Sequence, residues 1–268
     1  SVAGRPSAWR DDAPTITSGG GGMAAAVSVN ENATAVTTVT ATDVDDGATL
    51  SYSIAGGSDA ALFKIDAFTG VLSFISAPNS EAPTDSNGDS VYNVTVRAFD
   101  GTSFDDQAIT VTVNDVNEFA VTTPSDTNGV ANAVNENSAI GTVVGVTAHA
   151  SDADATTNTV SYSLTDNAGG KFAIDSSTGV VTVAGAIDRE ADGANLNITV
   201  RATSADGSIA DQTFAIGVND VNEFSVSTPS DTNGAANAVN ENSAIGTVVG
   251  VTAHASDADA TTNTVSYS

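Results

Sequence analysis

Cysteine is absent from the 268-residue sequence, and histidine occurs only 2 times, as His149 and His254. Disulfide bonds are therefore excluded, together with thiol catalysis and cysteine-based sites for soft metals. The histidines occupy one position in two copies of a repeated segment, and neither has a second histidine at metal-binding spacing. We expect both to be surface or strand-edge residues without a metal.

Basic residues are also scarce. The 7 lysines and arginines are outnumbered by 33 aspartates and glutamates, which gives a formal net charge of −26. Such a chain is repelled by phosphate backbones and by anionic membrane surfaces, so nucleic acid is not an expected partner. Because like charges destabilise a compact state unless cations neutralise them, cations are the first partners to consider.

Long apolar runs are missing as well. No segment approaches the roughly 18 apolar residues of a membrane-spanning helix, and the N-terminus lacks the apolar core of a secretion signal. Membrane insertion is therefore not expected. Because the sequence starts without a methionine and stops within an alternating segment, we interpret it as part of a longer protein, and we expect the targeting signals to lie outside it.

Two stretches of the sequence, 113–163 and 218–268, are identical except at Ala120/Ser225, Thr122/Ser227 and Val130/Ala235. The second stretch begins 105 residues after the first, which is the length of a whole β-domain rather than of a short solenoid unit. Each repeat should therefore have its own core. The chain is interpreted as a piece of a tandem array, a type of protein that commonly acts as a spacer, a stalk or a multivalent binder.

Strand patterns begin near Ala26, where short segments of valine, threonine and isoleucine alternate with clusters of glycine, asparagine, aspartate and serine. The segments 92–96, 109–113 and 196–200 alternate between apolar and polar residues, which is typical of strands with one buried face. By contrast, residues 1–22 show no periodicity and end in a glycine run, which predicts a linker or an expression remnant.

Acidic clusters recur in the same order in each repeat. The second repeat has Asn135-Glu136-Asn137, Asp152-Ala153-Asp154, Ile187-Asp188-Arg189-Glu190, Asp206-Gly207 and Asn219-Asp220-Val221-Asn222-Glu223. The first repeat has Asn30-Glu31-Asn32, Asp43-Val44-Asp45, Asn79-Ser80-Glu81, Asp100-Gly101 and Asn114-Asp115-Val116-Asn117-Glu118. A single aspartate in such a list is most simply a turn residue, but turns do not require the recurring glutamates. The ordered set favours calcium ligation, because calcium takes 6 to 8 oxygen ligands.

At these residues the chain resembles the cadherin repeat, in the form found in large bacterial surface proteins. The resemblance covers nearly everything after Asp11, and the segment 187–190, followed by 200–202 and 218–220, is its most specific part. It implies an all-β fold of tandem Greek-key β-sandwiches, cadherin-like and immunoglobulin-like, arranged linearly. The expected boundaries are a linker at 1–13, repeats at 14–117 and 118–222, and the N-terminal part of a third repeat at 223–268.

The resemblance also implies calcium sites where successive repeats meet. The first site would use Glu31, Glu81, Asp115, Asn117, Glu118, Asp152, Asp154 and Asp206. The second would use Glu136, Asp188, Glu190, Asp220, Asn222, Glu223, Asp257 and Asp259. Half of an upstream site would use Asp11, Asp43, Asp45 and Asp100.

The chain departs from the family pattern at several positions. Asn79 stands where the second repeat has Asp188, so the first site has one carboxylate fewer. Glu118 and Glu223 replace an aspartate of the family's linker, and two residues are inserted before Asp206.

Clustered carboxylates repel one another by roughly 1 kcal/mol per pair at 4 Å in water, and by about 4 kcal/mol at an effective dielectric constant of 20. We therefore expect calcium to control the rigidity of the array.

A weaker calcium signal is the run Asp85-Ser86-Asn87-Gly88-Asp89, which has the alternating oxygen spacing of a calcium loop but no distal glutamate. We interpret it mainly as a hairpin turn.

Catalytic motifs are not found: the sequence has no nucleophile elbow, phosphate-binding loop or zinc motif. Its acidic pairs fall at the ends of the predicted repeats rather than in one cleft, as a glycosidase requires. We therefore predict a protein that is not an enzyme.

The favoured hypothesis is a calcium-stiffened structural and adhesive region of a large secreted bacterial surface or matrix protein, acting in cell adhesion, biofilm or fibre formation. Neighbouring copies or repeats are the expected partners, outside the cell. One alternative is a polysaccharide-binding matrix module, which the scarcity of aromatic residues disfavours (1 Trp, 4 Tyr and 9 Phe). Another is a filament in which strands of a neighbouring chain complete the third repeat.

Overall fold

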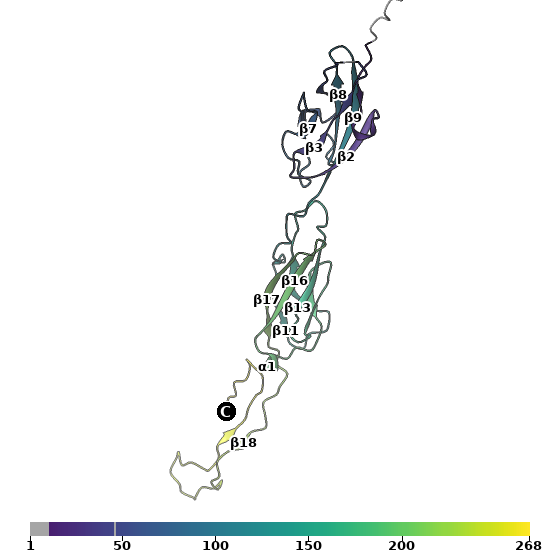
Figure 1. Ribbon diagram of the computed structural model, residues 1–268. Helices are drawn as coiled ribbons and strands as arrows, with labels where there is room; N and C mark the ends of the chain where they lie inside the picture. Colours follow the sequence, from purple (N-terminus) through teal and green to yellow (C-terminus); the bar gives the residue numbers. More distant parts are fainter. Residues whose placement is uncertain (1–10, 46) are drawn as a thin grey trace, which may run out of the picture. The chain divides into compact units, whose positions relative to one another are not determined.

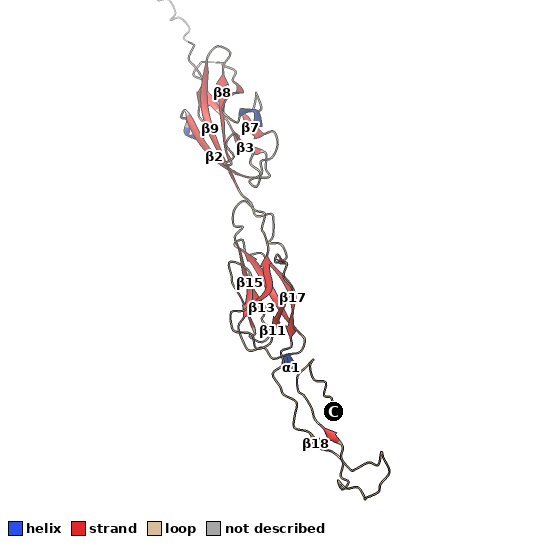
Figure 2. Ribbon diagram, turned by 180° about the vertical axis from the view of Figure 1, so that it is seen from behind, coloured by secondary structure: helices blue, strands red, loops and turns tan. Residues whose placement is uncertain are grey.

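The computed structural model describes residues 11–45 and 47–268. Nearly all of the regular structure is β-strand, and the described residues form two compact units (Figures 1 and 2). Unit 1 runs to Ala120 and includes residues 153–158, whereas unit 2 consists of residues 121–152 and 159–268. The all-β fold expected from the sequence is confirmed.

Unit 1 contains two main sheets that enclose its core. A four-stranded sheet has the order β2 (Ala24–Asn30), β9 (Phe104–Asn114), β8 (Val91–Phe99) and β5 (Ser51–Gly56). A three-stranded sheet has the order β3 (Ala35–Thr38), β7 (Val71–Phe74) and β6 (Phe63–Ile65). Strand β2 pairs in parallel with β9, whereas the other pairs are antiparallel. A short 3-10 helix, η2 (Ala60–Leu62), precedes β6.

Unit 2 has the same arrangement in its complete repeat. One sheet has the order β11 (Ala133–Asn135), β17 (Ile209–Asn219), β16 (Asn195–Ser204) and β13 (Val160–Asp166), with β11 parallel to β17. The other has the order β10 (Ser125–Asp126), β12 (Val143–His149), β15 (Val180–Val183) and β14 (Phe172–Ile174). A short helix, α1 (Arg189–Asp192), follows this sheet and is capped by the Asp188 carboxylate.

The alternation in the sequence correctly identified the buried faces of the longest strands. Tyr92, Val94 and Val96 in β8 are buried, and so are the matching valines and isoleucines of β9, β16 and β17. In unit 1 the core also contains a cluster of three rings, in which Phe74 lies 4.5 Å from Phe63 and 5.1 Å from Tyr92 between ring centroids. Each unit therefore has a separate apolar core, as the repeat length predicted.

The linker interpretation that composition gave for residues 1–22 is wrong for its last part, which the expected boundary at residue 14 assigned to the first repeat. Residues 15–16 form strand β1 (Thr15–Ile16), which pairs with β4 (Ala41–Thr42), and Ile16 is a fully buried core residue. The glycine run that follows contains the 3-10 helix η1 (Ser18–Gly20), and the Gln107 amide donates to the Ser18 and Gly22 carbonyls. Residues 1–10 lie outside the described residues, so the start of the linker stays a prediction.

Residues 223–268 contain only two short strands among the described residues, β18 (Ser230–Asp231) and β19 (Ala253–His254), which pair with each other. They match β10 and the end of β12 in the preceding copy. Most side chains of this segment are exposed, including Val249 and Val251, whereas the equivalent Val144 and Val146 are buried. The difference follows from packing, since Val144 and Val146 lie against strands that come later in their own repeat.

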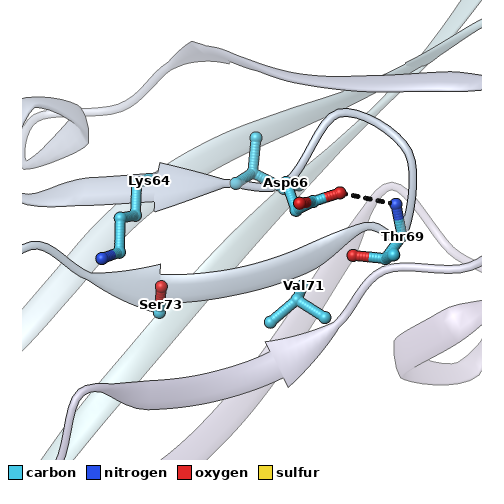
Figure 3. A pocket seen from close by; sticks show the side chains of 6 residues that line it. Lys64, Asp66, Thr69, Val71 and Ser73 are labelled. Atoms are coloured by element: carbon cyan, nitrogen blue, oxygen red, sulfur yellow. Dashed lines mark hydrogen bonds between the residues drawn. The ribbon is translucent and has the colours of Figure 1, made fainter.

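A tight turn with the same hydrogen bonds occurs in both repeats, at residues 66–70 and 175–179. Asp66 accepts a hydrogen bond from the backbone N–H of Thr69 at 2.8 Å (Figure 3). It accepts a second from the backbone N–H of Phe68 at 3.0 Å, and the turn ends at Gly70, which has a left-handed conformation. Asp66 and Thr69 also line a hollow of about 460 Å³ on the β6–β7 hairpin. Hydrogen bonds from Thr69 and Phe68 lower the pKa of Asp66, which fits a structural role in the turn.

Gly179, the equivalent of Gly70 in unit 2, has φ +70°, and a Cβ there would overlap the Ala148 carbonyl oxygen. We expect Gly179→Ala to lower the free energy of unfolding of unit 2 by about 2–4 kcal/mol, from backbone strain plus the steric overlap. The matched control is Gly169→Ala, because Gly169 also has φ +70° but has open space around its Cβ position. Urea unfolding should show a loss of only about 1 kcal/mol for the control. Equal losses of unfolding free energy in the two variants would contradict the inference that overlap with the Ala148 carbonyl oxygen destabilises Gly179→Ala.

Candidate metal centre

Glu31 is a buried glutamate that directly follows β2 and is only 3% exposed. Its carboxylate accepts two backbone hydrogen bonds, from Val116 at 2.7 Å and from Ser80 at 2.7 Å. Backbone N–H donors satisfy the oxygens of a carboxylate that is shielded from water. The side chain therefore holds the end of β2 against two segments that are distant in the sequence.

Glu136 has the same role in unit 2, where it follows β11 and is 2% exposed. It accepts hydrogen bonds from Val221 and from Arg189, both at 2.6 Å. The structure thus places Ser80 and Arg189 at equivalent positions, and Asn79 at the position of Asp188. Glu81 then corresponds to Glu190.

Each buried glutamate lies in a cluster of carboxylates. In unit 1, one oxygen each of Glu31, Glu81 and Asp115 lies within 4.8 Å of the others. In unit 2 the same distance limit joins Glu136, Asp188 and Glu190. All of these residues were selected from the sequence as calcium ligands. The fold brings them together from three separate segments in unit 1 and from two in unit 2.

Backbone N–H groups of one loop complete each cluster. In unit 1, Ala155 donates to Glu81 at 3.0 Å and Thr156 donates to Asp115 at 2.9 Å. The Thr156 hydroxyl also donates to Asp115. This explains why residues 153–158 belong to unit 1.

In unit 2, Ala260 donates to Glu190 at 2.8 Å, and the Thr261 N–H donates to Asp220 at 3.0 Å. The Thr261 hydroxyl donates to Asp220 as well. The sequence reasoning missed Thr156 and Thr261. The available signal was the run Asp-Ala-Asp-Ala-Thr, which ends with threonine in both copies.

Several carboxylate oxygens in these clusters are buried and have no hydrogen-bond partner among the described residues. They are Oε2 of Glu81, Oδ1 of Asp115 and Oδ1 of Asp220. An ionised oxygen that is shielded from water and lacks a donor is costly, and buried charges are normally paired or bound to a metal. Hard divalent cations are the partners that clustered carboxylate oxygens prefer. The residues present therefore fit a calcium ion.

In the first cluster the pKa values of two neighbouring acids are shifted in opposite directions. Burial raises the pKa of Glu81, and the nearby Asp115 and Glu31 carboxylates raise it further. Burial also acts to raise the pKa of Asp115, but the hydrogen bonds from Thr156 outweigh it, so that this pKa is lowered. A cation in the cluster would relieve the repulsion that Glu81 experiences.

The second cluster behaves in the same way. The pKa of Glu190 is raised by burial and by the charges of Glu136 and Asp220. The pKa of Glu223 is also raised, by burial and by the charges of Glu136 and Glu190. The pKa of Asp220 is lowered, chiefly by the Thr261 hydrogen bond. The carboxylates of this cluster therefore contribute to the raised pKa of Glu223.

The two linker segments contact a second set of predicted ligands. Asp154 is 1% exposed and accepts hydrogen bonds from the N–H groups of Glu118 and Phe119, at 3.0 and 3.2 Å. Asn117, another predicted ligand, directly precedes Glu118 in this linker.

In unit 2, Asp259 accepts hydrogen bonds from the N–H of Glu223 at 3.1 Å and from the Asn222 amide at 3.0 Å. Asp257 accepts a hydrogen bond from the N–H of Asp259 at 3.3 Å. Asn222, Glu223, Asp257 and Asp259 are thus connected by hydrogen bonds.

Asp206 is placed beside Asp152 in unit 2 despite the two inserted residues before it. One oxygen of each lies within 4.8 Å of the other. The Ser208 N–H donates to Asp206 at 2.7 Å, which closes a turn at the end of the β16–β17 hairpin. The two inserted residues therefore do not move the Asp206 carboxylate away from that of Asp152.

The upstream half-site is partly assembled in unit 1. The Ser103 hydroxyl donates to Asp11 at 2.6 Å, and the Ser103 N–H donates to Asp100 at 2.7 Å. Hydrogen bonds from Ser103 and Thr102 lower the pKa of Asp100. Asp11 and Asp100 are thus linked through one serine.

The other two predicted ligands of this half-site lie in the loop after β4. The Asp12 N–H donates to Asp45 at 3.0 Å, and the Asp45 N–H donates to Asp43 at 2.8 Å. Oδ2 of Asp43 and Oδ2 of Asp100 are buried without a hydrogen-bond partner among the described residues. Asp43 and Asp100 therefore each have a buried carboxylate oxygen without a donor in the part of the chain that the structure describes, as Glu81, Asp115 and Asp220 do.

The weaker candidates have structural explanations. Asp85 accepts hydrogen bonds from the N–H groups of Asn87, Asp89 and Ser90, at 3.3, 3.0 and 3.1 Å, so its carboxylate closes a loop, as in the turn interpretation. His149, at the end of β12, and His254, in β19, are both exposed, as expected.

Comparison with known proteins identifies a relationship over most of the chain. The family described as Cadherin domain matches residues 25–114 and 131–219. Protocadherin Fat 1 of Homo sapiens is 34% identical over 150 residues, which cover 55% of this chain and 3% of the relative. Protocadherin Fat 2 of Mus musculus is 36% identical over 164 residues, which cover 60% of this chain and 4% of the relative. The chain therefore spans only a small part of these relatives.

Solved structures agree with the sequence comparison. Mouse cadherin-23 EC22-24 superimposes with a TM-score of 0.72 and 26% sequence identity, covering 93% of this chain and 79% of that structure. The extracellular domain of protocadherin GammaB4 superimposes with a TM-score of 0.67 and 24% identity, covering 92% of this chain and 38% of that structure, and supports the fold alone.

Within the part of the chain that the structure describes, no helix is long and apolar enough to cross a membrane.

Proposed function

Because the chain belongs to the cadherin domain family, we propose that it is a calcium-binding, adhesive repeat region of a larger extracellular protein. In this proposal, calcium bound where successive repeats meet stiffens the array. The chain's own contribution is mechanical, and no catalytic role is proposed.

The observation that carries the proposal is the recurrence of one carboxylate arrangement in two units. Each unit combines a buried glutamate, fixed by two backbone N–H groups, with acids from other segments of the chain. In each unit, at least one carboxylate oxygen is buried without a hydrogen-bond partner among the described residues. Solvated turn residues do not require such oxygens, whereas a cation site does.

When bound, calcium would supply the positive charge that lets these carboxylates lie close together. The protein's residues provide the preorganisation: Glu31 and Glu136 are fixed by backbone donors, while Thr156 and Thr261 orient the linker aspartates. Each cluster takes its carboxylates from one sequence repeat, and its loop donors come from the next repeat. Ion binding should therefore restrict motion between successive repeats.

The setting of the proposed function follows from the family. The chain belongs to the cadherin domain family of adhesion proteins, for which an extracellular setting is proposed, and roughly 10⁻⁴ to 10⁻³ M is the calcium affinity of extracellular modules. Neighbouring repeats or copies of the protein are the proposed partners, as in an adhesive array. The relatives named above come from animals, so a bacterial surface or biofilm role stays a prediction from the sequence resemblance.

Thermal unfolding and small-angle X-ray scattering of the 268-residue chain during a calcium titration test the proposal. A ligand that binds only the folded state stabilises it by about 2.7 kcal/mol at 100 times its Kd. For a chain of this size, about 2–4 °C in Tm corresponds to each kcal/mol. We expect Tm to rise by about 5–10 °C at 10 mM calcium, and the particle to become longer and narrower.

Magnesium at the same concentrations is the control, because it prefers a smaller octahedral site and retains its water ligands. No change in Tm or in particle shape at 10 mM calcium would contradict the proposal. A rise in Tm without a change in shape would support calcium binding and contradict the stiffening.

A further inference from the structure

Asn32 and Asn137 directly follow the buried glutamates and have left-handed backbone conformations, with φ 61° and 56°. Positive φ is uncommon outside glycine, and asparagine is among the side chains that tolerate it best. The backbone N–H of Asn32 donates to the Pro78 carbonyl at 3.0 Å, and that of Asn137 donates to the Ile187 carbonyl at 3.0 Å. These bonds fix each asparagine against the segment that carries Glu81 or Glu190.

The side chains of the two asparagines reach the linker glutamates. The Asn32 amide donates to Glu118 Oε1 at 2.8 Å, and the Asn137 amide donates to Glu223 Oε1 at 3.3 Å. Both asparagines are 86 positions from their glutamates in the sequence, so the same contact recurs in two units. The linker glutamates are exposed, and an exposed glutamate has several accessible rotamers unless a partner holds it.

We propose that Asn32 and Asn137 are positioning residues for calcium binding, each holding the linker glutamate that follows the adjacent cluster in the orientation that the ion requires. The inference rests on the function proposed above. The Asn–Glu hydrogen bond then removes side-chain entropy before the ion arrives, which is the general benefit of preorganisation.

The charge distribution explains why a neutral donor is suitable here. Glu223, Glu136 and Glu190 are carboxylates of one predicted calcium site. Without a donor, repulsion would favour rotamers that point the carboxylate away from the cluster. A lysine would hold the carboxylate too, but its positive charge would oppose cation binding. An asparagine amide orients the glutamate without that charge.

The test uses Asn32→Gly, since glycine accepts the left-handed backbone without strain and lacks the amide. Isothermal titration calorimetry of the full chain with calcium should show binding at the first site weakened about three- to tenfold, as expected for the loss of one solvent-exposed hydrogen bond. Tm in EDTA should stay within about 2 °C of the wild type. Asn242→Gly is the matched control, because Asn242 has φ 62° at the same position in residues 223–268.

A double-mutant cycle with Glu118→Gln separates positioning from general stability. If Asn32 acts through Glu118, the double variant should bind calcium about as weakly as Glu118→Gln alone. Additive losses, or an unchanged calcium affinity in Asn32→Gly, would overturn the inference. A wild-type chain that takes up no calcium would instead overturn the proposed function, so the two failures are distinguishable.

Discussion

Glu136→Gln is expected to weaken calcium binding at the second cluster by about 100-fold, which corresponds to removing one partner of a buried charge interaction. Both oxygens of Glu136 accept backbone hydrogen bonds, from Val221 and Arg189. Glutamine offers one oxygen, and its amide would face the second N–H donor. The variant therefore loses a metal-ligating charge and leaves a buried donor without a partner.

The same substitution should also destabilise unit 2 in EDTA, by about 1–3 kcal/mol for one unsatisfied buried donor. An opposing effect is relief of the repulsion that Glu136 exerts on Glu190 and Glu223. Glu190 and Glu223 are both exposed, so solvent screens this repulsion and the lost hydrogen bond outweighs it.

Calorimetry and urea unfolding, each in calcium and in EDTA, measure the two effects separately. The matched control is Glu241→Gln, which removes the same charge from the same position of the repeat, where the side chain is exposed. The control should change neither the calcium affinity of the second cluster nor the stability of unit 2. Equal behaviour of the two variants would contradict the structural role assigned to Glu136.

Asn79→Asp is expected to strengthen calcium binding at the first cluster by about tenfold. Asn79 occupies the position of Asp188, and its Oδ1 already accepts the Glu81 N–H at 2.8 Å. A carboxylate has a second oxygen and a negative charge. At 4 Å and an effective dielectric constant of 20, one added charge interacts with another by about 4 kcal/mol, and solvent screening at this exposed position reduces the net gain to about 1–1.5 kcal/mol.

The reciprocal variant Asp188→Asn should weaken the second cluster by a similar factor. Asp188 also caps α1 through the Ala191 N–H at 3.0 Å, an interaction that asparagine preserves because it is an equally good cap. The difference in calcium affinity between the two clusters should therefore shrink in each single variant. Unchanged affinities in both variants would show that neither position contributes a ligand.

The alternation of apolar and polar residues was sufficient to predict the strands and their buried faces. Tyr92, Val94 and Val96 point inward because successive side chains of a strand alternate between the two faces of a sheet. The near-identity of 113–163 and 218–268 was sufficient to predict tandem repeats. Such local signals do not depend on which segments become neighbours.

The N-terminal segment shows where local reasoning failed. Residues 15–22 have a linker-like composition, yet Ile16 fills a core position and the glycine run is held by Gln107. Composition describes only the segment itself, whereas its burial depends on a partner strand and a core that lie elsewhere in the sequence.

By itself the sequence determined the repeat, the strand pattern and the set of acidic residues, because these are encoded by residue type and spacing. Only the tertiary structure decided which acids meet, which oxygens remain without a donor, and that Asn32, Asn137, Thr156 and Thr261 orient them. The reason is physical: these contacts join residues from separate strands and loops, so they exist only after the chain has folded.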